Sequence, residues 1–506
     1  MFSFFKKDPI RLGAILLAVS SLLSRVLGVI RDLVFSSIFG VGTEGGSFAL
    51  DAYFVAFKIP DFLYTLLIFG AMSAAFIPLY AELKKKEGNE KAFQFASQVL
   101  TGLMGILLFC SVLAWLLAPW IIPYLASGFD PELQVLAVTL TRIMLLSPIF
   151  MGLSSILQGI ENAHRSFYGT ALAPLLYNAS IIGAAALFGQ EYGVYALAYG
   201  VAFGAILHFL VQIPGTLHSG FTYRLHFQKK DAKWREFLTL SLPRLLGSSA
   251  LQLSSFADVF MASFLALGSL SVYTYAFNLQ SLPYGVVAVA VSTAVFASLA
   301  EQAEEKEEFL KAIKKSLSQI LFWVLPAILG LYLIREPLIK LLLERGAFDA
   351  QATQRTADML GFFVWAALPQ SFIPLFTRAF YALKKTSFPV LCACISIVIT
   401  ITFNALGIWV FKGDVSTLAV GNFIGGSFNA LLLYLGLARH FKQSPFAFLD
   451  FKKLGLQFVA LALMLLVLLE SVALPVLIQI ALAGLTYLGS IFVLKKSLKL
   501  RPSDQE

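Results

Sequence analysis

The sequence predicts an all-α polytopic membrane protein, and its composition and its long apolar segments carry that prediction. Of the 506 residues, 58% are hydrophobic and only 13% are charged. A soluble domain carries about 25% charged residues, so lipid must be the solvent for most of this surface. Crossing a hydrocarbon core about 30 Å thick takes about 20 apolar residues per helix. Segments of that length recur along the whole chain, which indicates one membrane body.

We expect about fourteen transmembrane helices. The first apolar segment lacks the small-residue cleavage site that follows a signal peptide, so it is interpreted as a retained helix. Several expected spans exceed the minimum crossing length and contain proline, which predicts tilt and kinks. The expected spans are 10–39, 48–82, 91–125, 132–160, 168–188, 194–215, 237–266, 270–300, 309–334, 350–382, 387–411, 416–438, 454–472 and 475–494.

The basic residues indicate the topology of these helices. Of the 38 lysines and arginines, 27 fall in the two termini and the even-numbered loops. The odd-numbered loops hold four, which are Arg335, Lys340, Arg345 and Lys412. Because positive residues favour the cytoplasmic side, both termini are expected in the cytoplasm. The net charge of +9 is therefore a topology signal, and no nucleic-acid partner is expected.

An internal repeat underlies the helix pattern. Three short matches share an offset of 219 residues: 24–28 with 243–247, 73–82 with 292–301, and 128–130 with 347–349. Each repeat holds six expected spans, an even number, so the two halves are parallel. Such paired halves are typical of alternating-access transporters, with the substrate site between them. The predicted domains are a six-helix lobe at 1–219, a second six-helix lobe at 220–438, and two further helices with a short tail at 439–506.

Charged residues inside the spans are the candidate functional groups. An ionised group there costs at least about 2.5 kcal/mol, so it usually faces a water-filled cavity or has a partner. Arg25 lies fourteen residues beyond Arg11, about 21 Å deeper along a helix, which is too deep for comfortable snorkelling. Arg244 occupies the repeat-equivalent position but follows Arg235 by only nine residues. A structural ion pair is the alternative for Arg25, and snorkelling is the alternative for Arg244.

The other candidates lie on the first and second spans. Arg31 and Asp32 are adjacent, so we expect them to point to different faces of their helix. The alternative to a functional role is that they mark the outer end of that helix. Asp51 is a candidate ligand, with capping of its own helix as the alternative. Lys58 and Asp61 are three residues apart, which favours a simple intrahelical ion pair.

Asp258 is the remaining acidic candidate, in the seventh span. It lies mid-span with no basic residue within four positions. We expect either a protonatable group or a partner on another helix.

Several classes of chemistry have no signal in the sequence. No G-x-x-x-x-G-K-[ST] loop is present to bind nucleotide phosphates, and the five histidines form no metal-ligand spacing. All three cysteines lie in apolar segments, where a cysteine behaves as a small hydrophobe. We therefore expect a non-enzyme without cofactors. Transport would draw on the membrane potential or a monovalent cation, because one charge crossing 100 mV supplies about 2.3 kcal/mol.

Several motifs resemble one family of transporters. They are SRVLGVIRDLVFSSIFG at 24–40, DAYFVAFKIP at 51–60, GAMSAAFIPLYAE at 70–82, APLLYNASII at 173–182, LPYGV at 282–286, ERGAF at 344–348 and RAFYA at 378–382. This pattern resembles the MurJ/MviN family of the multidrug/oligosaccharidyl-lipid/polysaccharide exporter superfamily, over nearly the whole chain. The resemblance implies flipping of lipid II, the undecaprenyl-pyrophosphate-linked disaccharide-pentapeptide, to the outer leaflet for peptidoglycan synthesis.

The resemblance also implies which residues act. The family's functional residues match Arg25, Arg31, Asp32 and Asp51, which belong to a cationic cavity for the pyrophosphate. Arginine suits that role because it pairs bidentately with phosphate oxygens. The last two helices would help to form a groove for the lipid tail. The implied partners are lipid II and membrane lipids, with cell-wall synthesis proteins as further partners.

The chain departs from the family pattern at three positions. Tyr64 and Asn278 stand where the family usually has arginines, and Phe69 stands where it has a glutamate. Losing two arginines weakens a pyrophosphate site, and Arg244 is expected to compensate. The alternatives are a flippase for another polyprenyl-linked glycan, a cation-coupled multidrug exporter with Asp258 and Asp51 as ion ligands, and an inactive scaffold for cell-wall enzymes.

Overall fold

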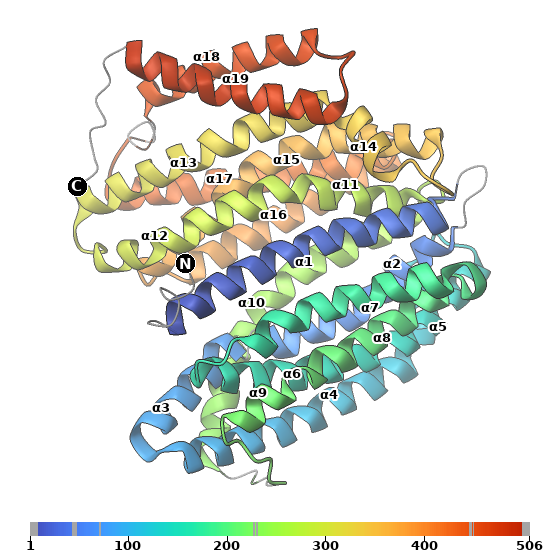
Figure 1. The fold of residues 1–506 in the computed structure, drawn as a ribbon, viewed down its shortest axis with the longest axis vertical. Coiled ribbons are helices and arrows are strands. Elements are labelled where there is room, and N and C mark those ends of the chain that lie inside the picture. Colours follow the sequence, from blue (N-terminus) through green and yellow to red (C-terminus); the bar gives the residue numbers. More distant parts are fainter. Residues whose placement is uncertain are drawn as a thin grey trace. The chain divides into compact units, whose positions relative to one another are not determined.

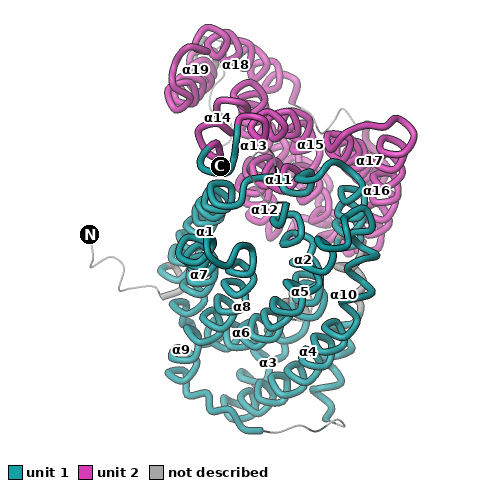
Figure 2. Tube along the Cα trace, turned by 90° about the vertical axis from the view of Figure 1, so that its right-hand side faces the viewer, with its two compact units in different colours: residues 1–271, 345–349 teal, residues 272–344, 350–506 magenta. Residues whose placement is uncertain are grey.

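The structure is a computed structural model that describes residues 9–42, 48–69, 72–225, 228, 231–444, 448 and 450–497. Every regular element in these residues is a helix (Figure 1). The chain divides into two compact units (Figure 2). Unit 1 comprises 1–271 and 345–349, and unit 2 comprises 272–344 and 350–506.

The helices of unit 1 include two short π-helical segments, η1 and η2, between α2 and α3. Their bounds are α1 Pro9–Phe39, α2 Ala49–Tyr64, η1 Thr65–Phe69, η2 Met72–Phe76, α3 Ile77–Glu87, α4 Asn89–Leu125, α5 Pro131–Met144, α6 Leu146–Ala163, α7 Tyr168–Tyr192, α8 Val194–Leu210, α9 Ile213–His218 and α10 Ala232–Ser263.

Small residues let the helices of unit 1 pack closely. A Cβ added at Gly200 of α8 would lie 2.7 Å from the Cβ of Ala184 on α7, so only glycine permits this approach. Such small-residue contacts are typical of helices packed in lipid, where the hydrophobic effect between helices is absent. In the same unit, Phe76 and Phe95 stack within an apolar core that includes residues of η2, α3, α4 and α6.

Unit 2 contains the remaining helices. Their bounds are α11 Ser269–Pro283, which begins in unit 1, η3 Tyr284–Ala288, α12 Val289–Glu301, α13 Lys306–Leu333, α14 Arg335–Leu343, α15 Ala350–Ala382, α16 Ser387–Ala405, η4 Leu406–Val410, α17 Ser416–Phe441, α18 Phe451–Glu470 and α19 Val476–Ser497. The last two helices pack on each other and on α13, with Tyr487 Oη donating to the Phe322 carbonyl at 2.9 Å.

The helix boundaries repeat along the chain at the offset that the sequence motifs share. The π-helical segments Thr65–Phe69 and Tyr284–Ala288 begin 219 residues apart. The α5–α6 segment and α15 span 131–163 and 350–382, which is the same offset again. Unit 1 nevertheless includes α10, which the repeat assigns to the second lobe. The two units are defined by how closely their residues pack, whereas the repeat is defined by sequence matches. The division into units therefore does not test the predicted lobe boundaries, which stay a prediction.

Eleven helical segments in the described residues are long and apolar enough to cross a membrane. Each overlaps one of the fourteen expected spans. The three expected spans outside this set correspond to α1, to the segment from α2 to α3, and to α10, and these hold the candidate charges. A multi-pass membrane protein is therefore confirmed, and the count of fourteen stays a prediction.

Candidate substrate site

The first candidate group lies on α1. The side chains of Arg31 and Asp32 form an ion pair with 3.1 Å between Nη2 and Oδ1. Adjacent positions leave a helix about 100° apart, and here the charged ends of the two side chains meet. The Arg31 guanidinium also lies 5.8 Å from the centre of the Phe35 ring. Arg25 is exposed on the same helix, two turns nearer its N-terminus. α1 therefore carries an exposed cation and, six residues further on, a half-buried ion pair.

A second group joins α2 to α10. Lys58 Nζ donates to Ser255 Oγ at 2.9 Å, and Gln252 Nε2 donates to Asp61 Oδ2 at 3.4 Å. No ion pair within 4.0 Å links Lys58 to Asp61, although both residues are described. The predicted intrahelical pair is thus wrong, because each side chain has a partner on α10.

Asp51 has a different structural role. Its Oδ2 accepts from Gly268 N at 2.9 Å, and its Oδ1 accepts from Ser271 N at 2.8 Å and from the Ser271 hydroxyl. These donors belong to the first turn of α11 and the residue before it. The 1% exposed Asp51 therefore caps α11, whereas the sequence suggested either a ligand or a cap of its own helix.

The remaining candidates are placed as follows. Asp258 is buried in α10, within electrostatic range of Lys58. Arg244 also lies in α10, but its side chain is outside the described part of the structure, as is that of Phe69. Tyr64 ends α2 and packs against the apolar core of unit 1. Asn278 is half-buried in α11 and belongs to unit 2.

These contacts determine what the described side chains offer a ligand. Asp51 is committed to α11, Asp32 to Arg31, and Asp61 to Gln252. No cluster of three or more His, Cys, Asp or Glu side chains suited to a metal ion occurs in the described ranges. The arrangement places two arginines on α1 and a lysine on α2, and Arg31 and Lys58 are themselves held by Asp32 and Ser255.

Sequence reasoning missed the partners. Ser255, Gln252 and Ser271 are small or neutral polar residues about 190 to 220 positions away from the acids and the lysine that they contact. Nothing in their local sequence indicates these contacts. A serine or glutamine inside an apolar helix carries no signal that distinguishes it from a residue bonded to its own helix.

Comparisons with known proteins identify relatives over most of the chain. A family model described as "Lipid II flippase MurJ" matches residues 35–492. A protein of Burkholderia cenocepacia named "Lipid II flippase MurJ" is 31% identical over 444 residues, which is 85% of each chain. A "Probable lipid II flippase MurJ" of Thermotoga maritima is 30% identical over 389 residues, 77% of this chain and 78% of its own.

Solved structures agree with this result. One described as "Lipid II flippase MurJ, inward closed conformation" has a TM-score of 0.81 and 28% identity, and the match covers 96% of this chain and 99% of that one. A multidrug resistance MATE family transporter in an inward-facing conformation has a TM-score of 0.68 at 14% identity, covering 85% of this chain and 98% of its own. The second match shows a shared fold alone.

Proposed function

The chain belongs to the MurJ family of lipid II flippases, and we propose that it moves lipid II from the inner to the outer leaflet of the bacterial inner membrane by alternating access. The match of the family model to residues 35–492 carries this proposal. Structures of a multidrug resistance MATE family transporter in inward-facing and outward-facing conformations, which share this fold, support the alternation. Both termini are proposed to lie in the cytoplasm, on the basis of the basic loops.

For the pyrophosphate, we propose contacts with Arg25 and Arg31 on α1. Arginine forms charge-assisted, bidentate hydrogen bonds with phosphate oxygens. Asp32 would act through Arg31 by holding its guanidinium at 3.1 Å. Tyr64 and Asn278 are uncharged where the family usually has arginines, and Arg244 would supply the missing positive charge. Asp258, near Lys58, would set the local potential and is the candidate for coupling to a monovalent cation or to the membrane potential.

For the lipid tail, we propose the surface that α18 and α19 share with α13. A pocket of about 260 Å³ lies there in unit 2, with Phe322, Leu456 and Ile491 among its lining residues. Lys315 and Lys453 also line it. Apolar walls with basic residues alongside suit an isoprenoid chain that continues from an anionic group.

Lipid II translocation in cells depleted of their own flippase tests the proposal. The chain should restore growth and should make lipid II accessible to a lipid II-cleaving enzyme added outside the cells. Arg25→Ala, expressed at the same level, should restore neither. The matched control Arg165→Ala changes an exposed cation in the loop between α6 and α7 and should behave as wild type. Failure of a well-inserted wild-type chain in hosts that make its own lipid II variant would contradict the proposal.

A further inference from the structure

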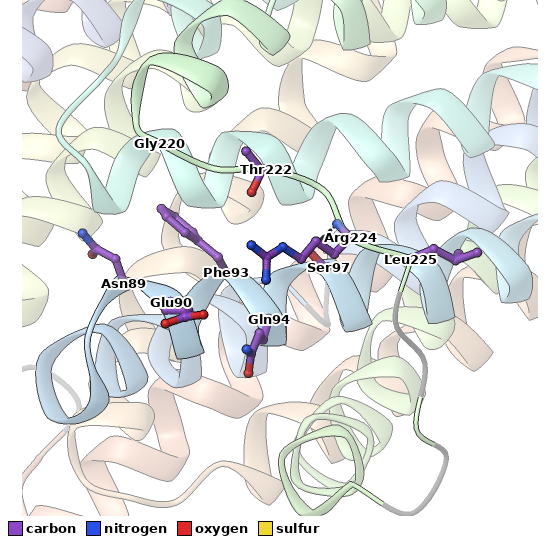
Figure 3. A pocket seen from close by; sticks show the side chains of 9 residues that line it. All are labelled: Asn89, Glu90, Phe93, Gln94, Ser97, Gly220, Thr222, Arg224 and Leu225. Atoms are coloured by element: carbon purple, nitrogen blue, oxygen red, sulfur yellow. Dashed lines mark hydrogen bonds between the residues drawn. The ribbon is translucent and has the colours of Figure 1, made fainter.

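A pocket of about 630 Å³ lies at the N-terminal end of α4 and shares no residue with the candidate substrate site. The first turns of α4 form one wall, and the extended segment 220–225 that follows α9 forms the other. Figure 3 shows the Arg224 side chain extending from that segment toward Phe93 and Gln94, with Glu90 one turn nearer the start of α4. This volume falls within the range of small-molecule sites.

Beyond the pocket, one face of the same helix carries an exposed apolar stripe. Steps of three or four residues along α4 keep to one helical face. Along this face the residues change from polar at the pocket to exposed and apolar further on. In order they are Glu90, Gln94, Ser97, Thr101, Met104, Leu108, Val112 and Trp115.

The depth of the pocket matches the headgroup layer of a bilayer. Leu108 lies fourteen residues beyond Gln94, about 21 Å along the helix axis. Between them, the Tyr223 hydroxyl lies 3.0 Å from Thr101 Oγ1, and the Tyr223 ring is 45% exposed. Tyrosine is enriched at the membrane–water interface, where its ring meets the acyl chains and its hydroxyl meets water. The pocket therefore lies on the aqueous side of this boundary, and the apolar stripe lies on the lipid side.

The charges of the pocket indicate the kind of headgroup. Arg224 and Glu90 both line it, and no ion pair within 4.0 Å joins them in the described structure. An arginine fork suits a phosphate, and a carboxylate accepts hydrogen bonds from a primary ammonium. One group of each sign favours a zwitterion over an anion. A quaternary ammonium has no N–H to donate, so a carboxylate discriminates against it.

We propose that this pocket binds the headgroup of phosphatidylethanolamine, with the phosphate on Arg224, the ammonium on Glu90, and the acyl chains along the apolar stripe of α4. The lipid would occupy the leaflet that faces the N-terminal end of α4. It would sit there as a bound structural lipid, separate from the transported substrate.

Native mass spectrometry of the delipidated full-length chain tests this site without using translocation. The protein is titrated with phosphatidylethanolamine, phosphatidylcholine and phosphatidylglycerol of identical acyl chains. Phosphatidylethanolamine should bind most tightly. Arg224→Ala should weaken its binding about threefold to fivefold, as expected for a partly exposed charge pair. Glu90→Gln should remove the preference over phosphatidylcholine and leave phosphatidylcholine binding unchanged.

Matched controls and a soluble headgroup make the test decisive. Lys91→Ala changes an exposed cation about 100° around α4 from Glu90, and Glu87→Gln changes an exposed acid outside the pocket; both should bind as wild type. Glycerophosphoethanolamine, which lacks acyl chains, should bind far more weakly than the lipid. Equal binding of the three lipids, unchanged binding in both pocket variants, or soluble headgroup binding as tight as the lipid would each overturn the proposal.

Discussion

Asp51 allows a test that separates a fold-stabilising carboxylate from a substrate ligand. In Asp51→Ala, the amides of Gly268 and Ser271 lose their acceptors at 2.9 Å and 2.8 Å, in a buried position. A buried donor left without a partner costs about 1–3 kcal/mol. Two such donors set an expected loss of about 3 kcal/mol in the free energy of unfolding, with α11 freed at its first turn.

Two measurements detect this loss of stability. Hydrogen exchange of the peptide that covers residues 264–272 should accelerate about 100-fold if 3 kcal/mol of protection is lost, since each 1.4 kcal/mol is a factor of ten. Denaturant titration in mixed micelles should show the lower free energy of unfolding. Asp130→Ala is the matched control, because Asp130 precedes α5 as its N-cap and makes no side-chain cap hydrogen bond. It should change neither measurement appreciably.

The refuting result is equally specific. If Asp51→Ala abolished lipid II translocation while exchange and unfolding stayed as in wild type, Asp51 would act on the substrate and the capping argument would be wrong. Asp51→Asn provides a second test of capping. Its side-chain oxygen can still accept from Ser271, but its NH2 group would face the Gly268 amide, which then loses its acceptor. Capping therefore predicts an intermediate loss of stability, about 1–2 kcal/mol.

Three further predictions concern other parts of unit 1. Gly346→Ala should displace residues 345–349 from Ser37, because φ at this position is +60° and the new Cβ would lie 2.1 Å from the Ser37 carbonyl oxygen. The Ala347 amide donates to that oxygen, so its hydrogen exchange should become faster. Unchanged exchange would contradict the prediction. Ser154→Ala should cost about 2 kcal/mol of unfolding free energy, because it removes a buried hydroxyl that accepts from Gln212 Nε2 at 2.6 Å and bonds His208 Nδ1 at 2.7 Å. Thr139→Ala, which removes only an exposed bond within its own helix, should cost little. Burial, with a contribution from Lys84, lowers the pKa of His164 below its usual 6.5, so its stabilisation is present above pH 6.5 and is lost as pH falls through the folded pKa. His164→Phe should therefore flatten the dependence of stability on pH below 6.5, and an unchanged slope would refute this cause.

The sequence predicts the membrane class and the repeat because both are local or periodic signals. Apolar runs determine where helices cross, and the 219-residue offset reappears in the bounds of η1 and η3. The partners of Asp51 and Lys58 could not be predicted in this way. Their contacts with Ser271 and Ser255 join residues about 200 positions apart, and no composition or spacing rule connects them. The sequence indicates that a buried charge needs a partner, and only the packing of helices identifies it.

The charge balance of the candidate residues leads to a last prediction. Among the described intramembrane side chains of α1, α2 and α10, the three cations Arg25, Arg31 and Lys58 stand against four carboxylates, which are Asp32, Asp51, Asp61 and Asp258. An anionic pyrophosphate needs a positive potential, so the cation at Arg244 should matter through its charge. Arg244→Ala should reduce lipid II translocation, and adding Asp61→Asn should partly restore it because the local charge returns to its original value.

A pair of controls isolates that electrostatic effect. Arg244→Lys retains the charge without the guanidinium fork and should keep most of the activity if potential dominates. Asp61→Asn alone should leave expression unchanged, because an asparagine oxygen still accepts from Gln252. If Arg244→Lys is as inactive as Arg244→Ala and Asp61→Asn gives no rescue, Arg244 acts through bidentate contact geometry. In that case a positive electrostatic potential does not explain how this chain compensates for the arginines that Tyr64 and Asn278 replace.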